Sequence, residues 1–328
     1  MKLLQRAFWV VVLSAGGLAA CGKPNDPPAP AVPAAVAKTK LAAQGAATAE
    51  QMAKDARSDV KCPAKIKSPA RATGAPVDDV IGVRPGMSYD EAANAVLCTH
   101  DLLVMQSDVT RGFNLKTYGQ KLRHGFGARF AEPRVEWTAK RAQAESLDQM
   151  LARSGNAARD DMKPGQARWY VGTMGLPGQE RVVNVAREER FDNGASPTIA
   201  SIEQALLNKY GPATKQQNNN GQRYINWSFD PSGRLVTPGT PLFNRCTGNA
   251  SPDGGVTLSP DCGTVVTAIV APLRENPDLA LSLQVGVVDQ AGGYQLVTTT
   301  EQALLQADQQ RRAKETANAA KNAAAPKL

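Results

Sequence analysis

Apolar and polar residues alternate along several short segments in the second half of the chain. In residues 224–229 every second side chain is apolar, which is the pattern of a strand with one buried face. Residues 167–174 and 181–187 flank a short loop rich in Gly and Pro, so they predict a hairpin. Further strands are expected over 264–272 and 279–289. These segments together indicate antiparallel sheet.

Helical spacing of apolar residues marks several other segments. Ser88 and Glu91 have the spacing of a capping box, and apolar residues recur at helical intervals behind them. Residues 202–210 have a similar apolar face and end at a Gly-Pro pair. Helices are also expected over 134–153 and from the Thr298 capping residue onward, with the chain after Asp308 fraying. The pattern as a whole predicts an α+β fold, in which helices pack on antiparallel sheet.

The first 21 residues differ from this pattern. Lys2 and Arg6 precede a short apolar run, which is too short for a helix to span a bilayer and is typical of a secretion signal. Small residues then lead through Leu18-Ala19-Ala20 to Cys21 and resemble the lipobox of bacterial lipoproteins. The resemblance implies that the chain is cut before Cys21, that this cysteine is lipidated, and that the lipid anchors the protein in a membrane. Gly22, in the place of a retaining Asp, implies the outer membrane, with the body facing the periplasm.

Composition divides the chain into five regions. We expect a signal peptide in 1–20, a Pro- and Ala-rich lipidated tether in 21–75, and a mainly helical start of the body in 76–165. An antiparallel α+β domain follows in 166–300, and a C-terminal helix with a frayed tail occupies 301–328. The tether is expected to be disordered apart from a helix over 46–57, which has mainly Ala with which to contact a core.

Two local resemblances fall within the body. Gly86-Met87-Ser88 followed by Glu91-Ala92 resembles the helix entry of BamE-like small outer-membrane lipoproteins of the barrel-assembly machinery. The sequence departs from that pattern at Cys98-Thr99-His100-Asp101. Residues 201–212, which end in Tyr210-Gly211-Pro212, resemble an element of uncharacterised secreted bacterial proteins and imply no activity.

Four cysteines remain after Cys21, which suggests two disulfides in an oxidising compartment. Three pairings are possible. We favour the sequential one, which joins Cys62 to Cys98 and Cys246 to Cys262, because each bond closes a local loop. Zinc is the alternative for four cysteines, but no C-x-x-C pair is present. We therefore expect no metal.

The 328-residue chain has 38 basic and 30 acidic residues, and removal of Lys2 and Arg6 lowers its formal net charge from +8 to +6. The densest basic stretch lies between residues 111 and 141. Arg123, Arg129 and Arg134 within it form either a solvated face or a patch for an anionic partner. Nucleic acid is not an expected partner, because an exported chain seldom meets it.

Candidate chemistry is sparse. The chain has only two histidines and lacks G-x-S-x-G, H-E-x-x-H, Walker and G-x-G-x-x-G motifs, so we expect neither a catalytic site nor a cofactor. Asp253 and Asp261 do not have the spacing of a calcium loop. The sequence predicts a binding or scaffold factor of the envelope with a protein partner in the periplasm or outer membrane. The alternatives are an inhibitor or immunity lipoprotein for a hydrolase and an enzyme acting on envelope polymers through carboxylates.

Overall fold

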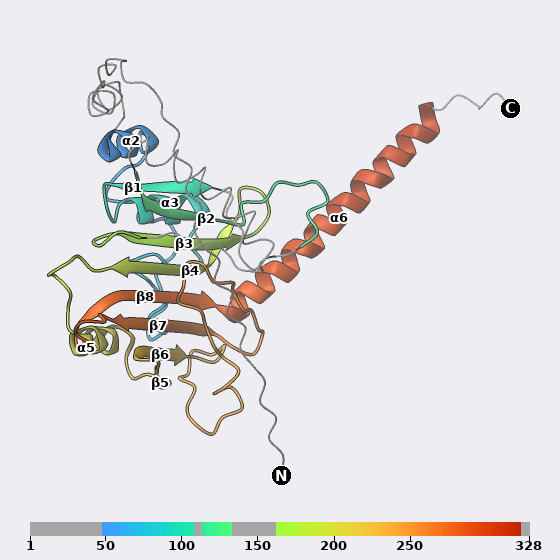
Figure 1. The fold of residues 1–328 in the computed structure, drawn as a ribbon. Coiled ribbons are helices and arrows are strands. Elements are labelled where there is room, and N and C mark those ends of the chain that lie inside the picture. Colours follow the sequence, from blue (N-terminus) through green and yellow to red (C-terminus); the bar gives the residue numbers. More distant parts are fainter. Residues whose placement is uncertain (1–47, 108–112, 114, 133–161, 323–328) are drawn as a thin grey trace, which may run out of the picture. The chain divides into compact units, whose positions relative to one another are not determined.

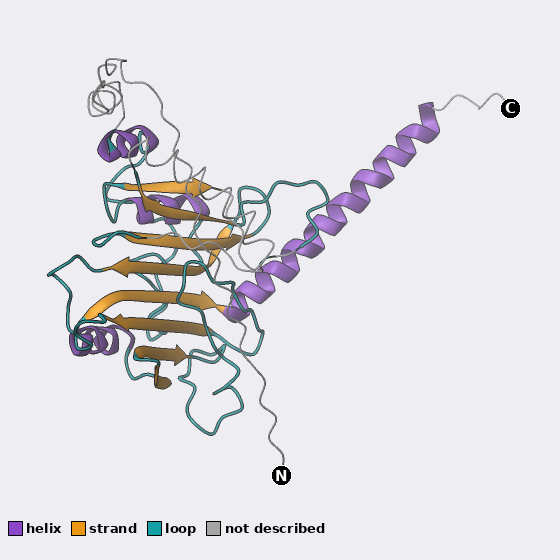
Figure 2. Cartoon of the chain, viewed as in Figure 1, coloured by secondary structure: helices purple, strands orange, loops and turns teal. Residues whose placement is uncertain are grey.

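The computed structural model describes residues 48–107, 113, 115–132 and 162–322 (Figure 1). They form an α+β fold in which helices accompany a single antiparallel sheet of eight strands (Figure 2). The strands are β1 (Leu103–Ser107), β2 (Gly125–Phe130), β3 (Ala167–Met174), β4 (Arg181–Arg190), β5 (Lys215–Asn219), β6 (Gln222–Ser228), β7 (Thr264–Pro272) and β8 (Ala280–Asp289). The helices are α2 (Ala49–Ala56), α3 (Tyr89–Leu97), α5 (Ile199–Tyr210) and α6 (Gln290–Asn322).

The strand order is β1-β2-β3-β4-β8-β7-β6-β5. Most neighbours in the sheet are also neighbours in sequence, and the exception is the pairing of β4 with β8, which joins the two halves of the sheet. The region 76–165, which we expected to be mainly helical, supplies β1 and β2 to this sheet. Described strands from both of the expected regions, 76–165 and 166–300, therefore belong to one sheet.

Helices α3 and α5 pack on the same face of the sheet, because both contribute to one hydrophobic core with the strands. Ala92 and Val96 come from α3, and Ile202 and Leu206 come from α5. The buried strand residues that they meet are spaced two apart: Phe126, Ala128, Trp169, Val171, Ile225, Trp227, Val266, Ala268, Val285 and Val287. Because side chains alternate across a strand, the residues between them face the other side.

Most of the predicted elements are confirmed. The hairpin, the strands over 222–228, 264–272 and 280–289, and helix α5, which ends at Tyr210, lie where the pattern placed them. Ser88 and Glu91 form the expected capping box. The helix expected over 134–153, the signal peptide and Cys21 lie outside the described residues.

Helix α6 differs from its prediction at both ends. It begins at Gln290 rather than at Thr298, because the Asp289 carboxylate accepts a hydrogen bond from the Gly292 amide and caps the first turn. It also continues to Asn322, where we expected fraying beyond Asp308. Asp308 forms ion pairs of 2.6 Å with both Arg311 and Arg312, which support the helix at this point.

The described part of the expected tether is fastened to the body. Cys62 and Cys98 have their sulfurs 2.04 Å apart, the distance of a disulfide. Asn94 of α3 accepts a hydrogen bond from the Lys61 amide and donates one to the Lys61 carbonyl. Ala53 of α2 is buried. The helix expected over 46–57 is present as α2. The prediction that the rest of the tether is unpacked is wrong for residues 58–75, because polar side chains of α3 and a disulfide bind a segment that is poor in apolar residues.

Glu91 links this segment to α3 and should make the stability of the fold sensitive to acid. Its carboxylate accepts hydrogen bonds from the Ser68 hydroxyl, from the Ser88 amide and from the amides of Lys67 and Ser68. Burial alone would raise the pKa of Glu91, but these hydrogen bonds more than offset it and lower the pKa to about 2.

A carboxyl with a depressed pKa stabilises the fold above its ordinary pKa, and this contribution disappears as the pH falls through the depressed value. We expect Glu91→Gln to lower the free energy of unfolding by a constant amount above the ordinary pKa of 4.5, with a difference that shrinks toward pH of about 2. Urea unfolding of both proteins across this range measures it. A difference that does not change with pH would contradict the assignment.

Candidate functional site

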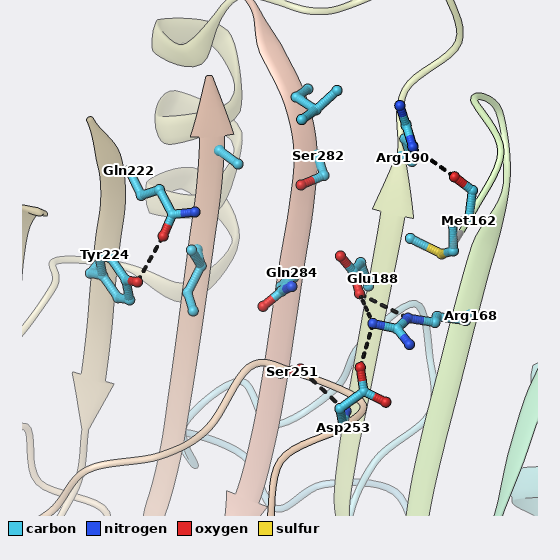
Figure 3. A pocket seen from close by; sticks show the side chains of 13 residues that line it. Met162, Arg168, Glu188, Arg190, Gln222, Tyr224, Ser251, Asp253, Ser282 and Gln284 are labelled. Atoms are coloured by element: carbon cyan, nitrogen blue, oxygen red, sulfur yellow. Dashed lines mark hydrogen bonds and ion pairs between the residues drawn. The ribbon is translucent and has the colours of Figure 1, made fainter. Parts of the chain in front are cut away.

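The face of the sheet opposite α3 and α5 carries a polar groove (Figure 3). Five adjacent strands, β3, β4, β8, β7 and β6, supply most of its lining, and its volume is about 510 Å³. This volume is in the usual range of small-ligand sites. We call it the sheet groove and define it by its lining residues: Met162, Arg168, Glu188, Arg190, Gln222, Tyr224, Ser251, Asp253, Ile269, Ala271, Leu281, Ser282 and Gln284.

An ion-pair cluster closes one side of the sheet groove. Arg168 of β3 lies directly opposite Glu188 of β4 in the sheet register. Its Nε and Nη2 donate to the same Glu188 carboxylate oxygen at 2.8 and 2.6 Å, and Nη2 also lies 2.5 Å from the Asp253 carboxylate. The side chains of Arg168 and Glu188 are each only 13% exposed. One arginine thus binds two carboxylates at a largely buried position.

The cluster stays charged in the folded protein. Burial alone would lower the pKa of Arg168, but the hydrogen bonds and charges of Glu188 and Asp253 outweigh burial and raise it. The guanidinium lies between the two carboxylates and binds both. The cluster is therefore suited to fixing the shape and charge of the groove wall, and poorly suited to transferring protons.

The wall on which Asp253 lies is the loop between Cys246 and Cys262. The sulfurs of these cysteines are 2.06 Å apart, so both predicted cysteine pairs are at disulfide distance. The loop backbone lies directly on β8, since a Cβ at Gly286 would come within 2.0 Å of the Asn249 carbonyl oxygen. Only glycine allows this close approach.

Hydrogen bonds fix the first two residues of the loop between Cys246 and Cys262. The Ser228 hydroxyl donates to the Cys246 carbonyl at 2.5 Å, and the Gln290 amide donates to the Thr247 carbonyl at 2.7 Å. Cys246 and Cys262 also pack with Val265 and Val288 in a small apolar cluster. The loop is thus a fixed wall of the groove.

The rest of the lining is rich in neutral hydrogen-bonding groups. Gln284 and Ser282 line the groove from β8, and the Tyr224 hydroxyl of β6 donates to Gln222 at 2.8 Å. At the far side, the Arg190 guanidinium donates to the Met162 carbonyl at 2.8 Å. Amides, hydroxyls and one guanidinium suit a polar ligand that both donates and accepts hydrogen bonds.

The basic residues singled out from the sequence lie elsewhere. The Arg123 guanidinium is 2.9 Å from Glu180 and 2.7 Å from Asp90, and it lies 4.2 Å from the centre of the Tyr89 ring. Its side chain is therefore occupied by partners within the protein. Arg129 lies on β2, half-buried, and Arg134 is outside the described residues.

The Arg123 pair should be structural. The Glu180 side chain is 2% exposed, and its pKa is lowered because the Arg123 guanidinium outweighs the effect of burial. We expect Arg123→Ala to leave this carboxylate buried without its cation and to cost about 2 kcal/mol in the free energy of unfolding. The matched control is Asp90→Asn, which removes the exposed acid of the same arginine and should cost under about 0.5 kcal/mol. Equal losses in the two variants would contradict this division.

The two acids that were considered for a calcium loop, Asp253 and Asp261, also lie within the described residues. The Asp261 carboxylate lies 2.7 Å from Arg245, and Asp253 binds Arg168, so the two acids have separate basic partners. Among the described residues, no group of three or more His, Cys, Asp or Glu side chains could hold a metal ion. Trp169, Tyr170 and Trp227 are buried in the core. Within the same residues no helix has both the length and the apolar character needed to span a membrane.

Comparisons with models of protein families, with curated proteins and with solved structures find no significant match to the chain.

Sequence reasoning placed the strands of the sheet groove but not the groove itself. Glu188, Arg190 and Gln284 were interpreted only as parts of strands, or lay just beyond them. One available signal was polarity: Ser282 and Gln284 alternate with the apolar residues Leu281, Leu283 and Val285, and so mark a polar face of a central strand. Asp253 gave no such signal, because its contact with Arg168 joins segments far apart in the chain.

Proposed function

We propose that the protein is a lipid-anchored binding factor of the bacterial envelope and that the sheet groove is where its partner binds. The anchor rests on the lipobox-like residues that end at Cys21, and the envelope location follows from that anchor. The observation that carries the binding role is the groove: a hollow of about 510 Å³ with polar side chains from four strands, β3, β4, β6 and β8, and a fixed wall.

The groove lining favours a polar partner segment. Neutral amides and hydroxyls give directional hydrogen bonds, and the Arg168 cluster supplies a charged wall that does not have to reorganise on binding. Preorganisation of this kind reduces the entropy lost when a partner is bound. We infer that a hydrogen-bonding segment of an envelope protein lies across β8, β7 and β6 in the complex.

The enzyme alternative has less support. Two carboxylates, Glu188 and Asp253, do line the groove, but Arg168 lies between them and binds both. A carboxylate that is already ion-paired with an arginine is poorly placed to act on a substrate. The geometry therefore favours recognition over turnover.

In-cell cross-linking tests the groove. A photo-reactive residue at Ser282, in the groove, should give an adduct with one envelope protein. The matched control places the same residue at Ala205, an exposed position on α5, which packs on the opposite face of the sheet, and it should give no adduct. Equal adducts from both positions, or adducts from Ala205 alone, would remove the groove from the proposal.

Fractionation tests the anchor. Cys21→Ala removes the thiol that a lipid would be attached to, so the protein should leave the membrane fraction. As a control, membranes that carry the wild-type protein are washed with and without detergent. The wild type should be released only when detergent is present. Unchanged membrane association of the variant would overturn the lipoprotein assignment.

A further inference from the structure

A second hollow lies where the segment after α2 crosses the start of α3, away from the sheet groove. Its volume is about 600 Å³. Four basic side chains line it, Lys61, Lys65, Lys67 and Arg181, together with hydrogen-bonding groups of Ser68, Ser88 and Asn94. We call it the basic hollow.

The three lysines are held there by their backbone and not by their side chains. Residues 60–72 contain no acidic residue and form an irregular segment. The Lys61 backbone pairs with Asn94, Cys62 is joined to Cys98, and the amides of Lys67 and Ser68 donate to Glu91. Arg84 also donates to the Pro69 carbonyl. The segment is thus fixed at both ends while the ammonium groups stay exposed.

The cations of the basic hollow are available to a ligand. Among the residues that the structure describes, none of Lys61, Lys65, Lys67 and Arg181 forms an ion pair. Of the three acids that line the hollow, Asp90 is paired with Arg123 at 2.7 Å. The Glu91 carboxylate accepts hydrogen bonds from Lys67 and Ser68. Of the three acids, this leaves Asp59 to neutralise the cations. Basic groups therefore outnumber the acids that could neutralise them.

An apolar side chain lies beside these cations. Ile66 is 45% exposed and stands in the chain between Lys65 and Lys67. Exposed isoleucine among lysines is the combination by which peripheral proteins contact a lipid surface, because the ammonium groups meet phosphates while the apolar group enters the interface.

We propose that the basic hollow binds the phosphate groups of anionic membrane lipids. Lys61, Lys65, Lys67 and Arg181 supply charge and hydrogen bonds to the phosphate, and Ile66 contacts the acyl boundary. This contact would give the body a fixed orientation at the membrane. It does not depend on the sheet groove or on a lipid at Cys21.

Vesicle binding tests the basic hollow directly. The protein used is residues 22–328, which has no lipid anchor and keeps both disulfides and the whole core. We expect it to bind vesicles that contain phosphatidylglycerol and not vesicles of phosphatidylcholine alone. Lys61→Gln, Lys65→Gln and Lys67→Gln together should weaken this binding about 100-fold, since each lysine near an anionic surface contributes about fivefold.

A charge-matched control separates the hollow from net charge. Lys314→Gln, Lys321→Gln and Arg274→Gln together remove the same charge from exposed positions on α6 and the loop between β7 and β8. This control should change vesicle binding less than about threefold. All six residues are exposed, and thermal unfolding verifies that both triple variants are folded. Equal weakening by the two variants, or no weakening by the lysine variant, would overturn the proposal.

Inorganic phosphate distinguishes a lipid from a soluble ligand. At matched ionic strength it should displace the protein from vesicles no better than chloride does, because it offers neither a charged surface nor an apolar boundary for Ile66. Displacement by phosphate at matched ionic strength would overturn the assignment to lipid in favour of a soluble phosphate. Ile66→Ser should weaken vesicle binding with the lysines intact, and an unchanged affinity would remove the apolar contact from the proposal.

Discussion

Arg168→Ala should lower the free energy of unfolding by about 3 kcal/mol. The substitution leaves Glu188 and Asp253 close together without the guanidinium that binds both. Glu188 is largely buried, so its charge would be poorly solvated and would also repel that of Asp253. Chemical denaturation at neutral pH measures the loss, and the same variant should weaken binding at the sheet groove because its wall is no longer fixed.

Compensating variants separate lost charge balance from lost packing. Arg168→Met combined with Glu188→Leu and Asp253→Asn removes the cation and both charges, and it should recover most of the stability that Arg168→Ala loses. It should not recover partner binding, because the polar wall is gone. A loss below about 0.5 kcal/mol in Arg168→Ala would show that the cluster is too well hydrated to matter.

The double substitution Cys246→Ala with Cys262→Ala should also lower the free energy of unfolding by about 3 kcal/mol. This is the chain-entropy value for a bond that closes a loop of this length. The two cysteines are 16 residues apart in sequence and are buried. The loop between them has few apolar groups of its own, so it should detach from β8 when the bond is absent. Hydrogen exchange and limited proteolysis of residues 247–261 measure the release.

The second cysteine pair is the matched control. Cys62→Ala with Cys98→Ala should lower stability by a comparable amount, since that bond closes a longer loop with a separation of 36 residues. It lies at α3 and not at the sheet groove, so residues 247–261 should stay protected. If the two double variants release the same segments, the loop is not a separate wall of the groove.

The sequence predicted the elements that have an apolar period and missed those that do not. The strand over 222–228 and the capped helix at Ser88 were found because their buried side chains repeat every two or every three to four residues. Strand β5 has no such period, because its residues, Lys-Gln-Gln-Asn-Asn, are all polar. It is an edge strand that needs only the backbone of β6 as its partner. Asn220-Gly221, both with positive φ, is the hairpin turn that could have indicated it.

The Arg168 pair shows why the site itself could not be predicted. Met174 lies opposite Arg181 at the end of the hairpin, and this register continued without change would place Arg168 opposite Arg187. A register shift between Gly172 and Thr173 places it opposite Glu188 instead. One extra residue in a strand has no clear sequence signal, yet it converts a repulsive pair into an ion pair.

The described tether shows a different limit. Its composition, rich in Pro, Ala and Lys, is that of an unpacked chain. Its contacts come from Glu91 and Asn94 on α3, and the Cys62–Cys98 pairing is the one sequence feature that indicated an attachment. The composition of a segment indicates how much apolar surface it can bury. It does not indicate which hydrogen bonds a distant segment can form with it.

Filling the sheet groove tests the binding account most directly. Ser282→Trp places a large side chain in the groove on β8, and Ala205→Trp places the same side chain on exposed α5 as the matched control. With the envelope protein captured from Ser282 as the purified ligand, we predict that Ser282→Trp raises the dissociation constant at least about tenfold. Ala205→Trp should leave it unchanged, with both variants as stable as the wild type. Wild-type affinity in a folded Ser282→Trp protein would contradict the account and place the partner elsewhere, with the exposed edge of β5 as the next surface to test.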